Sequence, residues 1–151
     1  MAATGVITSR DYKIEYSPNG TTGWLDWSGF VSKINFSGGD VQVGKFQPLD
    51  TNRPILYPGK SDSLKATMSV VYTEVVTESY EVLRLAQRAG TGIFFRWSPR
   101  GGQTTELQYT SQVAYVTGGA DMPPSVDASS AAIVALDVTV EFSDYAVAAV
   151  A

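Results

Sequence analysis

The sequence predicts a mainly β protein, an antiparallel β-sandwich or barrel with one α-helix at about residues 78–89 and a long inter-strand loop at 37–60. Three observations support this fold class. Hydropathy alternates with a period of two along several segments, turn residues separate these segments, and a single segment has helical periodicity. A length of 151 residues fits one hydrophobic core, so we expect a single domain over residues 1–151.

The pattern of residues 12–36 predicts a series of short strands. Tyr12, Ile14 and Tyr16 alternate with polar residues, and the turn at 17–20 contains Asn-Gly, which tolerates a positive φ. A short strand follows at 24–27. The next strand is expected to place three apolar side chains inward: Phe30, Ile34 and Phe36.

Residues 37–60 break this pattern. The segment holds four glycines and three prolines but is also rich in large apolar residues, unlike a disordered loop. These side chains need a burial partner that the adjacent strands do not provide; the alternative is a loop folded back on its own domain. The candidate contact residues are Val41, Val43, Phe46, Leu49, Arg53, Ile55, Leu56 and Tyr57.

The helix follows a long strand at 64–73. Thr77 is the expected N-cap, and Gly90 suits the position just after the last turn. The expected apolar stripe consists of Val82, Leu85, Ala86 and Ala89, widened by Tyr80 and Leu83. It should cover a sheet edge or the end of the sandwich.

Three strands are predicted after the helix. The first lies within 92–102 and ends in a Ser-Pro turn, the second alternates over 106–115, and the third closes the fold. The third is expected to point Val134, Leu136, Val138, Val140 and Phe142 inward, and Asp137, Thr139, Glu141 and Ser143 outward.

The composition argues against an enzyme. Histidine and cysteine are both absent, which excludes disulfides, thiolate or imidazole metal sites and Ser-His-Asp catalysis. Asp137 and Glu141 stand about 13 Å apart on one strand, too far for a glycosidase pair. We expect no catalytic residues, no cofactor and no metal.

The charge distribution argues against nucleic-acid binding. The net charge is −4, and residues 101–151 contain six acids and no base, so no basic stripe is available to displace phosphate counterions. No apolar run approaches the length of a membrane span, and the N-terminus lacks a signal-peptide pattern. We expect no membrane association.

The tryptophans leave a second function open. Trp24, Trp27 or Trp97, exposed on one face, would suit a monomeric carbohydrate- or receptor-binding β-sandwich. Aromatic residues are also favoured in sheet cores and interfaces, and we prefer this interpretation of the tryptophans to a ligand-binding role.

The order of these segments resembles the major tail tube proteins of long-tailed bacteriophages. The resemblance covers essentially the whole chain. It rests on YKIEYSPNGTTGWLDWSGFV, SGGDVQVGKF, RPILYPGK before a long strand, a YEVLRLAQRAG helix, FFRWSPRGG and a closing strand. It implies a phage tail tube-like fold whose hexameric rings stack into a hollow tube, each subunit lending four strands to an inner barrel. The long loop would reach the neighbouring ring. Contractile-tail tubes, type VI secretion rings and tail terminators share this fold.

The resemblance also implies a place and a set of partners. The protein would be made in the host cytoplasm and reside in the virion tail. It would bind copies of itself and other tail components, namely tape-measure, tail terminator and distal tail or baseplate proteins. It would let DNA pass without specific binding. A polar or negative wall lets DNA slide. The lumen candidates are Asp137, Thr139 and Glu141, followed by Glu106, Gln108 and Thr110. Lys33 and Lys65 are expected to pair with acids of neighbouring strands.

Overall fold

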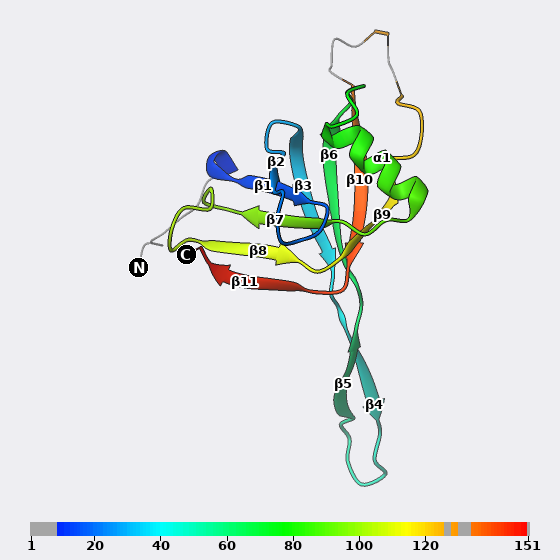
Figure 1. Ribbon diagram of the computed structural model, residues 1–151. Helices are drawn as coiled ribbons and strands as arrows, with labels where there is room; N and C mark the ends of the chain where they lie inside the picture. The colour runs from blue at the N-terminus through cyan, green and yellow to red at the C-terminus, as the bar shows by residue number, and fades with distance from the viewer. Residues whose placement is uncertain (1–8, 126–127, 130–133, 151) are drawn as a thin grey trace.

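The computed structural model describes residues 9–125, 128–129 and 134–150, and within these ranges the chain forms three antiparallel sheets and one α-helix (Figure 1). The predicted mainly β fold class with a helix is therefore confirmed. A short 3-10 turn, Ser9–Asp11, precedes the first strand.

The first sheet has five strands in the order β11-β8-β7-β1-β2. Every neighbouring pair is antiparallel. The strands are β1 Lys13–Ser17, β2 Leu25–Asp26, β7 Phe94–Ser98, β8 Leu107–Ser111 and β11 Tyr145–Ala149.

The second sheet has four strands in the order β3-β6-β10-β9. Its strands are β3 Val31–Gly38, β6 Leu64–Val71, β9 Ala114–Gly118 and β10 Ala135–Phe142. Figure 1 shows that its strands cross those of the first sheet at a steep angle. The core lies between the two sheets and includes Trp27, Phe95 and Trp97 from one side and Met68 and Val140 from the other. The inward positions predicted for the last strand are confirmed at Val138, Val140 and Phe142, which are buried.

The third sheet is a hairpin formed by β4 Val41–Phe46 and β5 Ile55–Ser61. It occupies most of the segment predicted as a long inter-strand loop, and it projects beyond the two packed sheets (Figure 1).

Helix α1, Ser79–Ala89, lies where the sequence predicts it but differs in two details. The N-cap is Glu78 rather than Thr77, without a side-chain capping bond, while Gly90 ends the helix in the left-handed conformation as expected. The buried face consists of Ser79, Tyr80, Leu83 and Ala86, whereas Leu85 is 45% exposed. The predicted stripe is therefore rotated around the helix, because α1 packs against β9 and β6 through its Tyr80–Leu83 side.

The predicted strand at 106–115 is two strands in different sheets. Ser111 and Ala114 are both buried, so the two exposed residues between them interrupt the alternation and carry the chain from β8 to β9. Strand β11 was also missed by the sequence analysis, because all five of its residues are apolar and all five are exposed. Period-two alternation cannot reveal such an edge strand.

Among the described residues, no helix has the length and apolarity needed to cross a membrane.

Candidate functional site

The hairpin of β4 and β5, here called the arm (Val41–Ser61), is the most distinctive surface of the molecule. Its strands pair in antiparallel register, with Phe46 opposite Ile55 and Lys45 opposite Leu56. In the connecting turn, the side-chain amide of Gln47 donates to the Thr51 carbonyl oxygen at 2.8 Å. The arm is therefore an ordered β-ribbon and not an irregular loop.

Every residue of both arm strands is exposed. Leu49 at the turn is 107% exposed, Tyr57 is 70% exposed and Phe46 is 66% exposed. The loop does not fold back on its own domain, so that alternative is wrong. All eight predicted contact residues lie on the arm, six on its strands and Leu49 and Arg53 in its turn. Concentrated apolar exposure of this kind is typical of surfaces that bind another protein.

Two glycines direct the arm away from the body. Gly38 and Gly39 have φ values of 82° and 75°, which side-chain-bearing residues rarely adopt. A Cβ atom at Gly38 would collide with the Ser63 carbonyl oxygen. At the same place, the backbone N–H of Gly39 donates to that carbonyl at 3.2 Å. The strands thus approach closely at the root of the arm, where only glycine fits.

The second candidate surface is the outer face of the four-stranded sheet, here called the polar face. It carries Asp137, Thr139 and Glu141, three of the predicted lumen residues. Ser69 Oγ donates to Asp137 Oδ1 at 2.6 Å, and a single hydrogen bond of 3.5 Å joins the hydroxyls of Thr67 and Thr139. Polar side chains of β6 and β10 are therefore linked across this face, and Tyr115 on β9, 48% exposed, lies in register with Glu141.

Lysines offset the carboxylates on the polar face. Lys65 Nζ lies 3.2 Å from Glu141 Oε1, as expected for a pair on adjacent strands. The expectation is wrong for Lys33, which has no ion-pair partner among the described residues and sits in register with Ser69. Two lysines and two carboxylates leave this face neutral rather than acidic.

The remaining lumen candidates belong to the other sheet. Gln108 and Thr110 lie on β8, and Glu106 immediately precedes it. Gln108 Nε2 donates to Ser98 Oγ at 3.1 Å, and Glu106 lies 3.5 Å from Arg100. The structure therefore separates the six lumen candidates into two sets on two different sheets, so they cannot line one surface of a subunit.

The tryptophans do not form an exposed platform. Trp27 and Trp97 are 1% and 2% exposed, and Trp27 stacks on Tyr16 with ring centroids 4.3 Å apart. The guanidinium of Arg96 covers the ring of Trp24 at 4.2 Å. The stacking surface that a sugar-binding module requires is therefore absent from these three positions.

An apolar pocket of about 360 Å³ opens beside the root of the arm. Burial, with a smaller contribution from Tyr109, raises the pKa of Tyr12 in its wall to about 12. Its lining residues are Tyr12, Phe36, Leu64, Trp97, Pro99, Tyr109, Phe142 and Tyr145. A pocket so poor in polar groups offers little to orient a polar substrate.

Within the described part of the chain, no group of three or more carboxylates is placed to hold a metal ion. The described residues therefore present two distinctive surfaces, an exposed apolar arm at one end and a broad polar sheet face.

Comparison with known proteins defines the fold more narrowly. No protein-family model matches the sequence, and no curated protein matches it. Solved structures do match. The SPP1 tail tube superposes with a TM-score of 0.72 at 14% identity, covering 95% of this chain and 80% of that one.

Two further structures match over nearly their full lengths. The sheath/tube terminator of a PVC extracellular contractile injection system gives a TM-score of 0.66 at 16% identity, covering 98% of this chain and 100% of that one. The tail of an empty GTA particle, with C6 symmetry, gives 0.65 at 12% identity, covering 99% and 100%. The chain therefore has the fold of tail tube and tube-terminator proteins, as the resemblance in its sequence implied.

Proposed function

We propose that this chain is a structural subunit of a phage-type tail that forms six-membered rings, and that these rings stack into a hollow tube. The observation that carries the proposal is the arm, whose large apolar side chains are between 44% and 107% exposed. The tail-tube fold supports it, since the structures that share this fold are structural tube components.

Ring closure uses the open edges of the four-stranded sheet. β3 and β9 are its edge strands, and an unpaired edge is a template for pairing with another chain. Pairing β3 of one subunit with β9 of the next would join the sheets into a closed barrel, which removes both edges. The C6 symmetry of the GTA tail supports a ring of six.

The polar face then lines the lumen. Its hydroxyls and neutral balance of charges present no basic patch to phosphate, so DNA would pass without specific binding. Asp137, Thr139 and Glu141 are the lumen residues in this arrangement. The five-stranded sheet would form the outer layer of the tube and is here called the outer sheet. It carries the other three candidates, Glu106, Gln108 and Thr110.

The subunit would be made in the host cytoplasm and reside in the virion tail. Its main partner is a second copy of itself, and the ends of the tube would contact tape-measure, tail terminator and distal tail or baseplate proteins. The PVC neighbour, a sheath/tube terminator, supports contacts of this class.

Electron microscopy of the purified protein at high concentration tests the proposal. The matched control is an armless variant in which residues 40–62 are replaced by Asn-Gly. The hydrogen bond from Gly39 to Ser63 already holds the two cut ends together, and Asn-Gly favours a two-residue hairpin.

Wild-type protein should form tubes of stacked rings. The armless variant should keep a cooperative melt and its β circular dichroism spectrum but make no tubes. A wild-type protein that stays monomeric by light scattering over a wide range of concentration and salt would contradict the proposal. Normal tubes from the armless variant would show that the arm has another role.

A further inference from the structure

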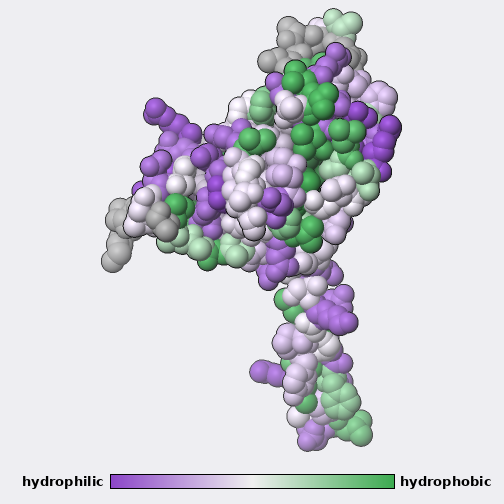
Figure 2. Space-filling model, viewed as in Figure 1, coloured by the Kyte–Doolittle hydropathy of each residue, from purple (hydrophilic) through white to green (hydrophobic). Residues whose placement is uncertain are grey.

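The end of the molecule opposite the arm carries a second exposed apolar surface. Val75, Val76, Leu85 and Met122 are 51%, 67%, 45% and 57% exposed; they lie on α1 and on the segments beside it and are here called the helix-end surface. Figure 1 places α1 at the far end of the body from the arm, and Figure 2 shows apolar groups gathered at both ends.

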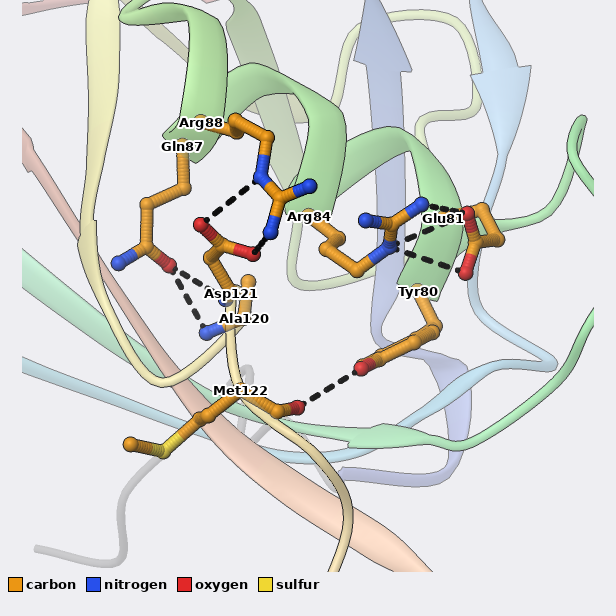
Figure 3. Close-up of polar contacts among 8 residues, drawn as sticks. All are labelled: Tyr80, Glu81, Arg84, Gln87, Arg88, Ala120, Asp121 and Met122. Atoms are coloured by element: carbon orange, nitrogen blue, oxygen red, sulfur yellow. Dashed lines mark hydrogen bonds and ion pairs between the residues drawn. The ribbon is translucent and has the colours of Figure 1, made fainter.

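Polar contacts fix the segment that carries Met122 against α1 (Figure 3). Gln87 Oε1 accepts hydrogen bonds from the backbone N–H groups of Ala120 and Asp121 at 3.0 and 2.8 Å. Tyr80 donates its hydroxyl to the Met122 carbonyl oxygen at 3.0 Å, and Arg88 pairs with Asp121 at 3.1 Å. The segment carrying Met122 is therefore fixed to α1, so docking here requires little ordering.

The two ends also have complementary charge. The arm has three basic side chains and one carboxylate over residues 41–60, a net charge of +2. The helix end has four carboxylates at 74, 78, 81 and 121 and two arginines at 84 and 88, a net charge of −2. Among the described residues, Lys45 and Arg53 on the arm and Glu78 at the helix end have no ion-pair partner.

We infer that the helix-end surface of one subunit receives the arm of a subunit in the adjacent ring. This inference rests on the proposed stacking of rings. Donor and acceptor lie at opposite ends of one chain, so the contact is head-to-tail and does not close on itself; such contacts generate open-ended stacks. A single pair of surfaces thus suffices for indefinite growth along the tube.

The reach of the arm fits this contact. The six residues of β4 span about 20 Å at the usual rise of a strand, and the eight residues of β10 span about 27 Å. The arm extends away from the body, so it carries the exposed turn at Leu49 beyond its own subunit and toward the next one.

Cysteine cross-linking tests the inference, because the chain contains no native cysteine. Leu49→Cys and Val76→Cys are prepared separately, mixed, assembled into tubes and treated with a short bifunctional maleimide. Both positions are exposed, so neither substitution disturbs the core. The matched control pairs Leu49→Cys with Thr110→Cys on the outer sheet.

A cross-linked dimer should form in the Leu49→Cys and Val76→Cys mixture, and should be absent from the control mixture and from each variant alone. Tubes in which Leu49→Cys links to Thr110→Cys and not to Val76→Cys would overturn the inference while leaving tube formation intact. Protein that makes neither tubes nor dimer would overturn both.

Charge reversal supplies an independent readout. Arg53→Glu should raise the protein concentration needed for tubes several-fold, and adding Glu78→Lys should lower it again by restoring opposite charges across the contact. A double variant that assembles no better than Arg53→Glu alone would count against the contact.

Discussion

At the scale of single residues, a partly buried ion pair between Arg96 and Glu15 stabilises the outer face of the five-stranded sheet. Glu15 is only 7% exposed, and Arg96 Nη2 lies 2.7 Å from its Oε2 on the adjacent strand. The same guanidinium covers Trp24. Arg96 therefore pairs with the nearly buried carboxylate of Glu15 and covers the ring of Trp24. From the sequence alone, Trp24 was a candidate for stacking on a ligand.

We expect Arg96→Met to lower the free energy of unfolding by about 3 kcal/mol, because it leaves the Glu15 carboxylate buried with only Lys13 at 3.7 Å. Arg88→Met is the matched control: its pair with Asp121 is largely exposed, and its loss should cost under about 1 kcal/mol. Urea unfolding measures both. Adding Glu15→Gln to Arg96→Met should recover part of the lost unfolding free energy. If nothing is recovered, Arg96 stabilises the fold mainly by packing on Trp24 and not by its charge.

Tyr12 makes stability depend on pH in the alkaline range. Its pKa is about 12 in the folded chain, mainly through burial, against an ordinary value of 10.0. Between these values the unfolded chain loses a phenolic proton that the folded chain keeps, so the free energy of unfolding falls as pH rises from 10 toward 12. Tyr12→Phe should flatten this slope in urea titrations at several pH values. Equal slopes for the two proteins would refute the assignment.

At the scale of elements, the sequence predicts those features of the fold that depend on a few neighbouring residues. The Asn-Gly turn between β1 and β2, the alternating strand β6 and the end of the helix at Gly90 are all found. The composition of 37–60 indicates apolar residues without a local partner. The β4–β5 pairing stayed hidden, because Gly44, Pro58 and Gly59 obscure the alternation of a ribbon exposed on both faces.

The root of the arm offers a test at this scale. Gly38→Ala adds a methyl group against the Ser63 carbonyl oxygen at a positive φ, so the arm must change direction or the root must open. We expect a loss of at least about 1 kcal/mol in unfolding free energy and failure to form tubes. Gly44→Ala, whose Cβ would lie 3.7 Å from the Tyr57 carbonyl oxygen, should behave as wild type. If both variants assemble normally, the direction of the arm is not set by Gly38.

At the scale of the whole molecule, the two packed sheets present different outer faces. The sequence predicted both sets of lumen candidates from outward alternation, but alternation does not tell which sheet a strand joins. Glu141 and Thr110 both alternate outward on their strands and lie on opposite layers. Only the pairing of distant strands, such as β10 with β6, makes one face continuous and polar.

This difference between the faces gives the final prediction. Thr117→Cys lies on β9 at the polar face, and Thr110→Cys lies on β8 of the five-stranded sheet, so the two variants are matched in residue type. In unassembled protein, both thiols should react with a maleimide attached to a bulky folded protein. In tubes, Thr110→Cys should stay reactive, whereas Thr117→Cys should be protected from the bulky reagent and still react with a small maleimide that diffuses along the lumen. Protection of Thr110→Cys with free reaction at Thr117→Cys would mean that the five-stranded sheet lines the channel. Glu106, Gln108 and Thr110 would then be the residues that face the DNA.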